Sequence, residues 1–148
     1  MRATFEGGSI AFPPGWKQVG DGDAERFVVR APDDMLQATV SAFYFAVEHD
    51  KQKDLDTFRR MLEHRLRAER EASSADLVLS TPAYSDLSDG TMVATYKGTE
   101  TNSRRFAAKL VMRDGTFIAV YLEAIGSGQR RFDEASATIF ESLSVHHK

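Results

Sequence analysis

The sequence predicts an α+β protein built as an α/β/α sandwich, in which a central antiparallel sheet carries one helix on each face. Two segments, 54–72 and 129–143, place apolar residues at the three- and four-residue spacing of amphipathic helices. Most of the remaining chain consists of short segments typical of strands. Two of these strands, joined at Asp114-Gly115, are apolar on both sides. Because an antiparallel sheet with one wet face alternates apolar and polar residues, we expect a helix over each face.

The composition predicts one ordinary soluble globular domain over residues 1–148. Hydrophobic residues make up 42% of the chain and charged residues 28%, a balance that favours neither disorder nor a membrane protein. The sequence has no cysteine, which excludes a disulfide scaffold, a thiolate metal site and a cysteine nucleophile. The net charge is -3 and no block of like charge stands out, so neither nucleic acid nor an anionic membrane is an expected partner.

The N-terminal segment is expected to form a hairpin that stops abruptly. Thr4–Glu6 and Ser9–Phe12 flank Gly7-Gly8, a plausible tight turn. Pro13-Pro14 cannot donate ladder hydrogen bonds, so the second strand ends there. Trp16 follows the break and is expected to cover the open end of the core; packing is favoured over ligand stacking, although Trp16 is kept as a candidate partner-binding residue.

Two strands are expected next, at Arg26–Arg30 and Gln37–Val47. In the longer strand, one face takes Val40, Ala42, Tyr44 and Ala46, and the other takes Thr39, Ser41, Phe43 and Phe45. Core packing explains most of these aromatic residues. If this strand lies near a sheet edge, however, one aromatic face is left as a docking patch, so Phe43 and Phe45 are candidate partner-binding residues.

The clearest helix is expected at Asp54–Ala72. The residues at helical spacing are Leu55, Phe58, Leu62, Leu66 and Glu69, and all but the last form an apolar stripe. Asp54 and Asp56 lie at the positive end of the helix dipole. Acidic residues and arginines balance along the segment, so we expect the arginines to form a solvated helix face and not a phosphate site.

The second half of the chain predicts five strands and a closing helix. The strands are expected at 77–80, 83–87, 91–99, 104–113 and 116–124, and the helix at 129–143. Asp114-Gly115 is the strongest hairpin signal in the chain and pairs Arg113 with Thr116. The same register pairs Lys109 with Val120 on that face. The helix has an apolar stripe made of Phe132, Ala135, Ile139 and Leu143.

The order of these elements resembles the Mog/PsbP-like family. Two motifs carry the resemblance: an apolar strand ending in Pro-Pro-Gly-Trp, at Ile10–Trp16, and a terminal amphipathic helix with the sequence FDEASATIFESL. The resemblance covers nearly the whole chain. It implies an α/β/α sandwich around an antiparallel sheet, and proteins that bind other proteins and do not turn over substrates.

Members of that family include a Ran-binding nuclear import factor, an extrinsic photosystem II subunit, and bacterial adaptors or immunity partners of secreted effectors. Residues 1–20 show no signal, transit or lipoprotein segment, which disfavours the photosynthetic role. No residues match a Ran-contact motif. The resemblance therefore implies a bacterial accessory protein.

No motif indicates catalysis, a metal or a cofactor. The histidines His49, His64, His146 and His147 lack a second histidine at the spacing of converging metal ligands. Gly126-Ser127-Gly128 departs from the G-x-S-x-G pattern, so Ser127 is expected near a helix N-cap. Gly20–Asp23 is too acidic to cradle a phosphate. We therefore expect no catalytic residues, no metal ligands and no cofactor.

Three cations give the remaining candidate site. Arg105, Lys109 and Arg113 fall at even spacing on one face of a strand, beside the apolar residues Ile118, Val120 and Leu122. If the covering helix leaves part of that face bare, this basic stripe borders an apolar groove suited to an acidic or amphipathic partner segment. The alternative is that the long side chains snorkel past the helix into water.

These observations predict a non-enzymatic domain that binds a protein partner, as a bacterial adaptor, chaperone or immunity partner of a secreted effector of the type VI system. The alternative is a domain that binds a small molecule or lipid in the space between sheet and helix, and an unrecognised hydrolase is a third hypothesis. No apolar segment is long enough to span a membrane. A cytoplasmic location is expected, or a periplasmic one if a signal peptide has been removed. Oligomeric state and partner identity stay open.

Overall fold

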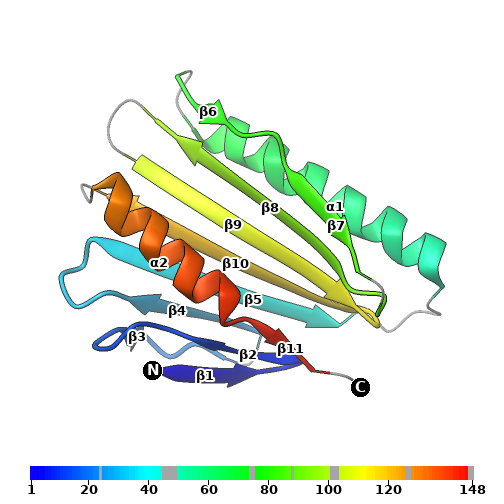
Figure 1. The fold of residues 1–148 in the computed structure, drawn as a ribbon, viewed down its shortest axis with the longest axis horizontal. Coiled ribbons are helices and arrows are strands. Elements are labelled where there is room, and N and C mark those ends of the chain that lie inside the picture. Colours follow the sequence, from blue (N-terminus) through cyan, green and yellow to red (C-terminus); the bar gives the residue numbers. More distant parts are fainter. Residues whose placement is uncertain are drawn as a thin grey trace.

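The computed structural model describes residues 1–23, 25–44, 50–73, 76–87, 89–100, 104–125 and 128–146. Its helices are α1 (Lys51–Ala72) and α2 (Gln129–Glu141) (Figure 1). The strands are β1 (Arg2–Phe5), β2 (Gly8–Ala11), β3 (Lys17–Val19), β4 (Arg26–Arg30), β5 (Leu36–Tyr44), β6 (Val78–Leu79), β7 (Ala83–Asp86), β8 (Met92–Thr99), β9 (Arg104–Arg113), β10 (Thr116–Ile125) and β11 (Ser144–Val145).

These strands form two antiparallel sheets. The main sheet has eight strands in the order β3-β4-β5-β10-β9-β8-β6, with β7 also paired to β8. The small sheet has three strands in the order β1-β2-β11. It lies at the lower end of α2 in Figure 1, and β11 follows directly from that helix. Segments from both ends of the chain therefore pair with each other.

The hairpin of β9 and β10 has the register that the sequence predicts. Arg113 pairs with Thr116, Lys109 with Val120, and the ladder continues to Arg104 and Ile125. Asp114 and Gly115 both have positive φ, as a two-residue hairpin turn requires. The middle of the ribbon is buried on both sides: Val111 and Ile118 on one face, and Leu110 and Phe117 on the other, are at most 3% exposed. The prediction of a central ribbon that is apolar on both faces is confirmed.

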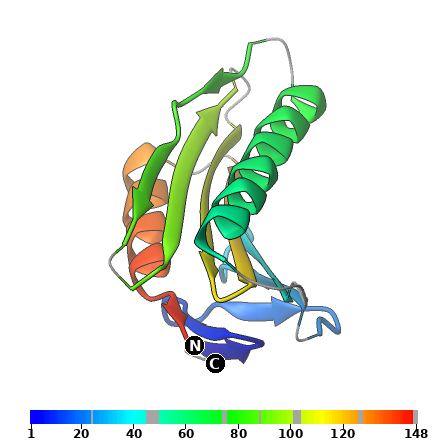
Figure 2. The ribbon, with the colours of Figure 1, turned by 90° about the vertical axis from the view of Figure 1, so that its right-hand side faces the viewer.

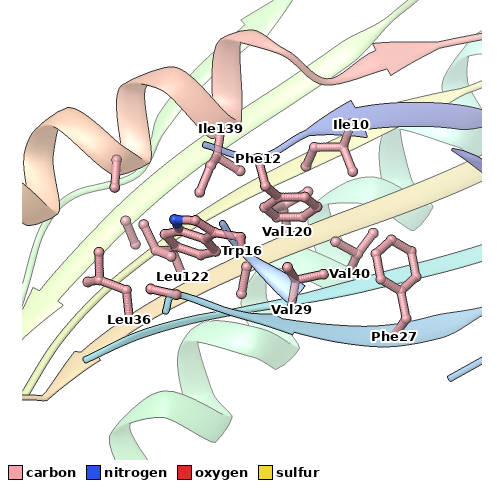
Figure 3. Close-up of a cluster of buried hydrophobic side chains, with 14 of the residues drawn as sticks. Ile10, Phe12, Trp16, Phe27, Val29, Leu36, Val40, Val120, Leu122 and Ile139 are labelled. Atoms are coloured by element: carbon pink, nitrogen blue, oxygen red, sulfur yellow. The ribbon is translucent and has the colours of Figure 1, made fainter. Parts of the chain in front are cut away.

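The first hydrophobic core lies between the main sheet and the layer made by α2 and the small sheet (Figure 3). Its labelled members are Ile10, Phe12, Trp16, Phe27, Val29, Leu36, Val40, Val120, Leu122 and Ile139. The Trp16 ring stacks on Phe12, with centroids 5.9 Å apart and planes at 21°. The strand break at Pro13-Pro14 thus places the indole against the core, as predicted.

The second core lies on the opposite face, under α1. It is built from Phe58, Met92, Tyr96, Phe106, Leu110, Met112 and Phe117, with Leu55, Leu62 and Leu66 packed at its side. Phe58 is the one fully buried residue of α1, and its ring lies 6.2 Å from that of Phe117. One helix covers each face, so the predicted α/β/α layering describes this arrangement.

The two helices are not directly opposite each other. In Figure 2, α1 lies over the β8 side of the main sheet, while β4 and β5 extend beyond it. Cross-strand pairing shows that α1 packs against the face that carries Phe106 and Phe117. The prediction that the sheet is apolar on both faces therefore holds for β9 and β10, but not for β4 and β5. These outer strands alternate buried residues with half-buried or exposed ones.

Several element bounds differ from the predictions. The first hairpin turns at Glu6-Gly7 and not at Gly7-Gly8, because Phe5 pairs with Gly8 and Gly7 takes a φ of 86°. Helix α1 begins at Lys51, before Asp54, because the Asp50 carboxylate accepts a hydrogen bond from the Lys53 backbone N–H at 2.8 Å.

The ends of two other predicted segments also change. Helix α2 stops at Glu141, before the predicted Leu143, and the chain then adds β11 to the small sheet. Its N-cap is Gly128, while Ser127 lies outside the described residues. The strand predicted to reach Val47 is described up to Tyr44, and residues 45–49 lie outside the described part. Strand β3 was not predicted, because its three residues are all exposed and show no alternation.

Candidate binding surfaces

Trp16 lies in the interior. Its side chain is 6% exposed and packs within the first core (Figure 3). Gly15 before it has a φ of 86°, which lets the chain turn the indole inward after the two prolines. The packing interpretation of Trp16 therefore matches its position, and a docking partner has little of this side chain to contact.

The three cations of the predicted basic stripe differ in their contacts and in their burial. Lys109 donates a hydrogen bond from Nζ to the Phe140 carbonyl oxygen at 2.9 Å, near the C-terminal end of α2. Arg113 has a side chain that is only 8% exposed, with Nη1 3.6 Å from Asp89 Oδ2. Arg105 is half-buried and lines a hollow near the start of α2. The three residues share a face of β9, but they do not form a continuous exposed stripe.

Two aromatic residues, Phe43 and Phe45, were predicted as docking candidates on the strand at 37–47, and the structure describes the first of them. Phe43 is 41% exposed and stands near the end of β5, on the α1 side of the sheet, where it pairs with Phe117. Phe45 lies outside the described residues. Tyr44, on the other face, is 45% exposed. Phe43 is therefore the one predicted docking residue that the structure places in an exposed position on a sheet face.

Phe43 belongs to a larger surface that α1 leaves uncovered. Cross-strand pairs put nine residues on this side of the outer strands: Lys17, Val19, Arg26, Val28, Arg30, Gln37, Thr39, Ser41 and Phe43. We call this surface the open face. All nine are half-buried or exposed, whereas the residues between them, such as Val29 and Val40, point into the first core. The open face spans β3, β4 and β5 beside α1 (Figure 2).

A groove runs along the other face of the sheet, between α2 and strands β6 to β8. It consists of two hollows of about 500 and 470 Å³ that share Ser80, Lys97, Phe132 and Asp133. One hollow continues to Arg105 and Gln129 at the start of α2. The other continues to Ala83, Ala107, Ala137 and Phe140 and is mainly apolar. We call this the α2 groove.

A polar cluster centred on Arg104 lies beneath the C-terminal end of α1. The guanidinium donates from Nε to Glu123 Oε2 at 2.9 Å, from Nη1 to Glu100 Oε1 at 2.6 Å, and from Nη2 to the Tyr121 hydroxyl at 2.6 Å. Glu69 of α1 adds a third carboxylate, with Oε2 3.8 Å from Nη2. The guanidinium also lies 4.8 Å from the centre of the Phe106 ring. Arg104 thus joins α1, β9 and β10.

Burial shifts the pKa values of several groups in this cluster. Desolvation raises the pKa of Glu69, more than the nearby Arg104 lowers it. Burial and the charge of Glu69 raise the pKa of Tyr96 to about 12. Burial alone lowers the pKa of Arg104, but the hydrogen bonds that its guanidinium donates to Glu123 and Glu100 raise the pKa by more, so the guanidinium stays charged. The cluster is an ion-pair network in which every carboxylate faces an arginine.

This cluster was not predicted from the sequence, although the sequence contains two signals for it. Glu69 falls at the helical spacing of the apolar stripe of α1, and Glu123 is paired with Phe106 on an apolar strand face. An acid on an apolar face needs a partner, because an unpaired buried charge is costly. Such a position predicts a cation nearby, but it does not say which of the nineteen Lys and Arg residues supplies it.

Metal ligands do not converge within the described part of the chain: no group of three or more His, Asp or Glu side chains there could hold an ion. His64 is exposed on α1 and His146 is exposed after β11, while His49 and His147 lie outside the described residues. Neither described helix combines the length and the apolar character needed to cross a bilayer.

Comparison with solved structures identifies the fold. The chain is similar to the cyanobacterial PsbP protein (CyanoP) of Synechocystis sp. PCC 6803, with a TM-score of 0.69 and 19% identity over 99% of this chain and 92% of that one. It is also similar to LpqN, described as involved in cell envelope biogenesis of Mycobacterium tuberculosis, with a TM-score of 0.55 and 15% identity over 93% and 82% of the two chains. The fold is therefore PsbP-like.

A third similar structure comes from Bacteroides thetaiotaomicron VPI-5482, with a TM-score of 0.54 and 15% identity. This chain is covered over 99% of its length and spans about half, 47%, of that protein. No protein-family model matches the sequence, and no curated protein matches it. At these identities the likeness concerns the fold, and the function has to be argued from the surfaces.

Proposed function

We propose that this chain is a non-enzymatic protein-binding domain whose docking surface is the open face. The observation that carries the proposal is the lateral position of α1, which covers β8 to β10 and leaves one side of β3, β4 and β5 uncovered, with an exposed Phe43. Exposed aromatic and arginine side chains on one surface are typical of protein interfaces. The open face offers both, since the exposed Arg26 lies on the strand next to that of Phe43.

The arrangement of the acids supports a binding role over a catalytic one. Among the described residues, the carboxylates of Glu69, Glu100 and Glu123 all face Arg104. A second group of acids lines a hollow of about 600 Å³ beside the start of α1, where Lys51 lies 3.7 Å from Asp86 and Arg113 lies 3.6 Å from Asp89; its acids are Asp50, Asp54, Asp86, Asp89 and Asp114. A general acid or base needs a pKa near the working pH and access to a substrate. Carboxylates held by an arginine under a helix suit a structural network better than either role.

The PsbP-like fold supports the wider part of the same proposal. We propose that the chain belongs to the Mog/PsbP-like family and acts as an accessory protein in bacteria, as an adaptor, chaperone or immunity partner of a secreted effector. The similarity to LpqN, described as involved in cell envelope biogenesis, is compatible with a periplasmic as well as a cytoplasmic site of action. A role in type VI secretion is one form of this proposal.

Affinity capture from the native host, followed by hydrogen exchange of the isolated complex, tests the docking surface. We expect one stoichiometric protein, with slower amide exchange in β3, β4 and β5 of this chain. Protection of α2 and β8 in place of those strands would overturn the choice of surface. Substituting Phe43→Ser should weaken the complex, while Tyr84→Ser, an exposed aromatic on β7, serves as the matched control.

A second candidate function is the binding of a small molecule or lipid in the α2 groove. The specific observation is a hollow of about 500 Å³ whose lining combines Phe132 with Lys97 and Arg105. This volume lies in the range of ligand pockets. Native mass spectrometry of the protein purified from its host distinguishes the candidates, because a ligand that copurifies and is lost in Gln129→Trp, a substitution in the lining of this hollow, supports the groove.

A further inference from the structure

We propose that the open face binds an acidic, partly apolar segment of the partner protein. This inference rests on the proposed function and adds the chemistry of the partner to it. The open face carries three cations, Lys17, Arg26 and Arg30, and no acid among its nine residues. The chain as a whole has a net charge of -3, so this surface has the opposite sign to the rest of the molecule. Electrostatic complementarity of this kind selects an acidic partner.

Acids lie near the open face, but within the described part of the chain they form no ion pair with its three cations. Glu123 lies on β10 beside Gln37, and its Oε2 accepts a hydrogen bond from Arg104 at 2.9 Å. Asp23, in the turn between β3 and β4, accepts from the backbone N–H groups of Glu25 and Arg26 at 2.8 and 2.9 Å. Asp34 lines a hollow together with Lys17 and Arg30 and is not ion-paired with either of them. The three cations are therefore available to a partner.

Two of the three cations are also free to move toward a partner. Lys17 and Arg26 are exposed, and within the described part of the chain no side-chain partner is bonded to either of them. Arg30 is half-buried and oriented by Gln37, whose Oε1 accepts from Nε at 3.1 Å and from Nη2 at 2.8 Å. Because glutamine is neutral, this contact fixes the guanidinium without cancelling its charge.

The open face is not only polar, which limits the partner further. Val19 is 38% exposed and pairs with Val28, and Phe43 is 41% exposed at the other end of the surface. A partner that buries these side chains has to present apolar groups between its acids. An extended segment that carries an acid and an apolar residue in turn at every second position, as in Glu-x-Leu-x-Glu, has this character, because alternate side chains of an extended chain point the same way.

Nucleic acid and anionic lipid are also negative, but the open face suits them less well. Its three cations come from three positions on β3 and β4, with the hydroxyl groups of Thr39 and Ser41 between them and Phe43. Binding to a phosphate backbone relies on many cations, and single strands also stack on several aromatic rings. The open face has one aromatic residue. A protein segment is the better match, and the other two classes become outcomes of the test.

The experiment is an NMR titration of the full chain with defined probes. The first probe is a synthetic peptide that carries glutamate and leucine in turn at every second position, with serine between them, and the second is the same peptide with lysine in place of glutamate. We expect the acidic peptide to shift amides of 17–19, 26–30 and 37–43, and the lysine peptide to leave them unchanged. An equal response to both peptides, or none to the acidic one, overturns the proposal.

Two charge-reversed variants make the test specific to this surface. Lys17→Glu with Arg26→Glu should weaken binding of the acidic peptide about tenfold, because two attractions become repulsions. Arg60→Glu with Arg67→Glu changes the net charge equally on the exposed side of α1 and should leave the affinity within about twofold. Equal losses in both variants would show that net charge alone drives binding, against the proposal.

Further measurements distinguish a failure of this inference from a failure of the proposed function. Tighter binding of phosphatidylserine vesicles or of single-stranded DNA than of the acidic peptide overturns a protein partner on this face. A partner captured from the host could slow amide exchange in β3 to β5 and yet bind the Lys17→Glu, Arg26→Glu variant with unchanged affinity. In that case the proposed acidic character of the partner is wrong, while the docking surface stands. If that partner slows amide exchange in the α2 groove and not in β3 to β5, the proposed docking surface itself is wrong.

Discussion

The Lys109 ammonium group donates a hydrogen bond from Nζ to the backbone carbonyl oxygen of Phe140 at 2.9 Å. This contact joins the middle of β9 to the last turn of α2, 31 residues away. A cation here also faces the negative end of the helix dipole. Lys109 was predicted as part of a docking stripe, but its position gives it a role in fixing α2 on the sheet.

Replacing Lys109 should therefore harm folding. Lys109→Met keeps most of the apolar stem but leaves the Phe140 carbonyl without this donor, and we expect a loss of about 1–2 kcal/mol in the free energy of unfolding. Urea unfolding followed by circular dichroism measures it. Lys97→Met on the neighbouring strand β8 is the control, since Lys97 is exposed, and should change stability by less than about 0.5 kcal/mol. Equal effects of the two substitutions would show that the hydrogen bond from Lys109 to Phe140 does not stabilise the fold.

Arg104 is expected to be the most important single charge in the chain. Arg104→Met leaves the partly buried carboxylates Glu69, Glu100 and Glu123 facing one another, and we expect a loss of about 2–4 kcal/mol. The lower part of this range reflects the 27% exposure of the arginine side chain. Arg130→Met breaks an exposed pair with Glu134 and should have little effect. Thermal unfolding of both variants decides whether the network stabilises the fold.

Glu69 should make stability depend on pH. Burial raises the pKa of Glu69 in the folded state, so the native protein holds this proton more tightly than the unfolded chain. Its contribution to stability is then fully present below the unfolded pKa and is lost as the pH rises through the raised folded pKa. Glu69→Gln has no proton to lose. The stability of the variant relative to the wild type should therefore rise as the pH increases above about 4, the ordinary pKa of a glutamate, measured by urea unfolding at each pH. A difference that stays constant as the pH rises contradicts the assignment.

Gly98 should not tolerate a side chain. A Cβ atom at this position would lie 2.8 Å from Cε1 of Phe106 and closer still to Cζ. Phe106 is fully buried and stacks on Tyr121 at 5.6 Å, so the ring has little room to move. We expect Gly98→Ala to lower the free energy of unfolding by about 1–3 kcal/mol. Gly128→Ala is the control, because a Cβ there meets nothing within 4 Å.

Trp16 provides a direct probe of the first core. Because the indole is 6% exposed, the single tryptophan should show blue-shifted emission that moves to longer wavelength on unfolding. Trp16→Ala should cost about 3–5 kcal/mol, whereas Val78→Ala, at a residue that is 69% exposed, should cost less than about 0.5 kcal/mol. Emission typical of a solvated indole in the folded protein would contradict the packing of Trp16 on Phe12.

Local patterns predicted most of the elements because each depends on neighbours in the chain. The two-residue turn at Asp114-Gly115 sets the whole register of β9 and β10, down to the pairing of Lys109 with Val120. The bounds were less accurate where a cap or a distant strand decides them. Helix α1 starts early because of the Asp50 carboxylate, and α2 stops early because the chain joins β2 as β11.

The binding surfaces were predicted less well than the elements. Even spacing correctly put Arg105, Lys109 and Arg113 on one face, but it gave no information on the contacts that Lys109 and Arg113 make. Phe43 was identified as a docking residue only on the condition that its strand lies near an edge. Lys17 was not identified because β3 was not recognised as a strand. Arg26 lies on a predicted strand, but its place on the same face as Phe43 depends on the pairing of β4 with β5, which the sequence pattern does not specify.

The sequence by itself determined the element types, the central hairpin and the need for a helix on each face of the sheet, since turn chemistry and hydrophobic period act over a few residues. Only the tertiary structure decided how far α1 reaches across the sheet. That position leaves the open face uncovered and brings Glu69 to Arg104, which already contacts Glu100 and Glu123. It is set by packing between side chains far apart in the chain, which no local pattern encodes.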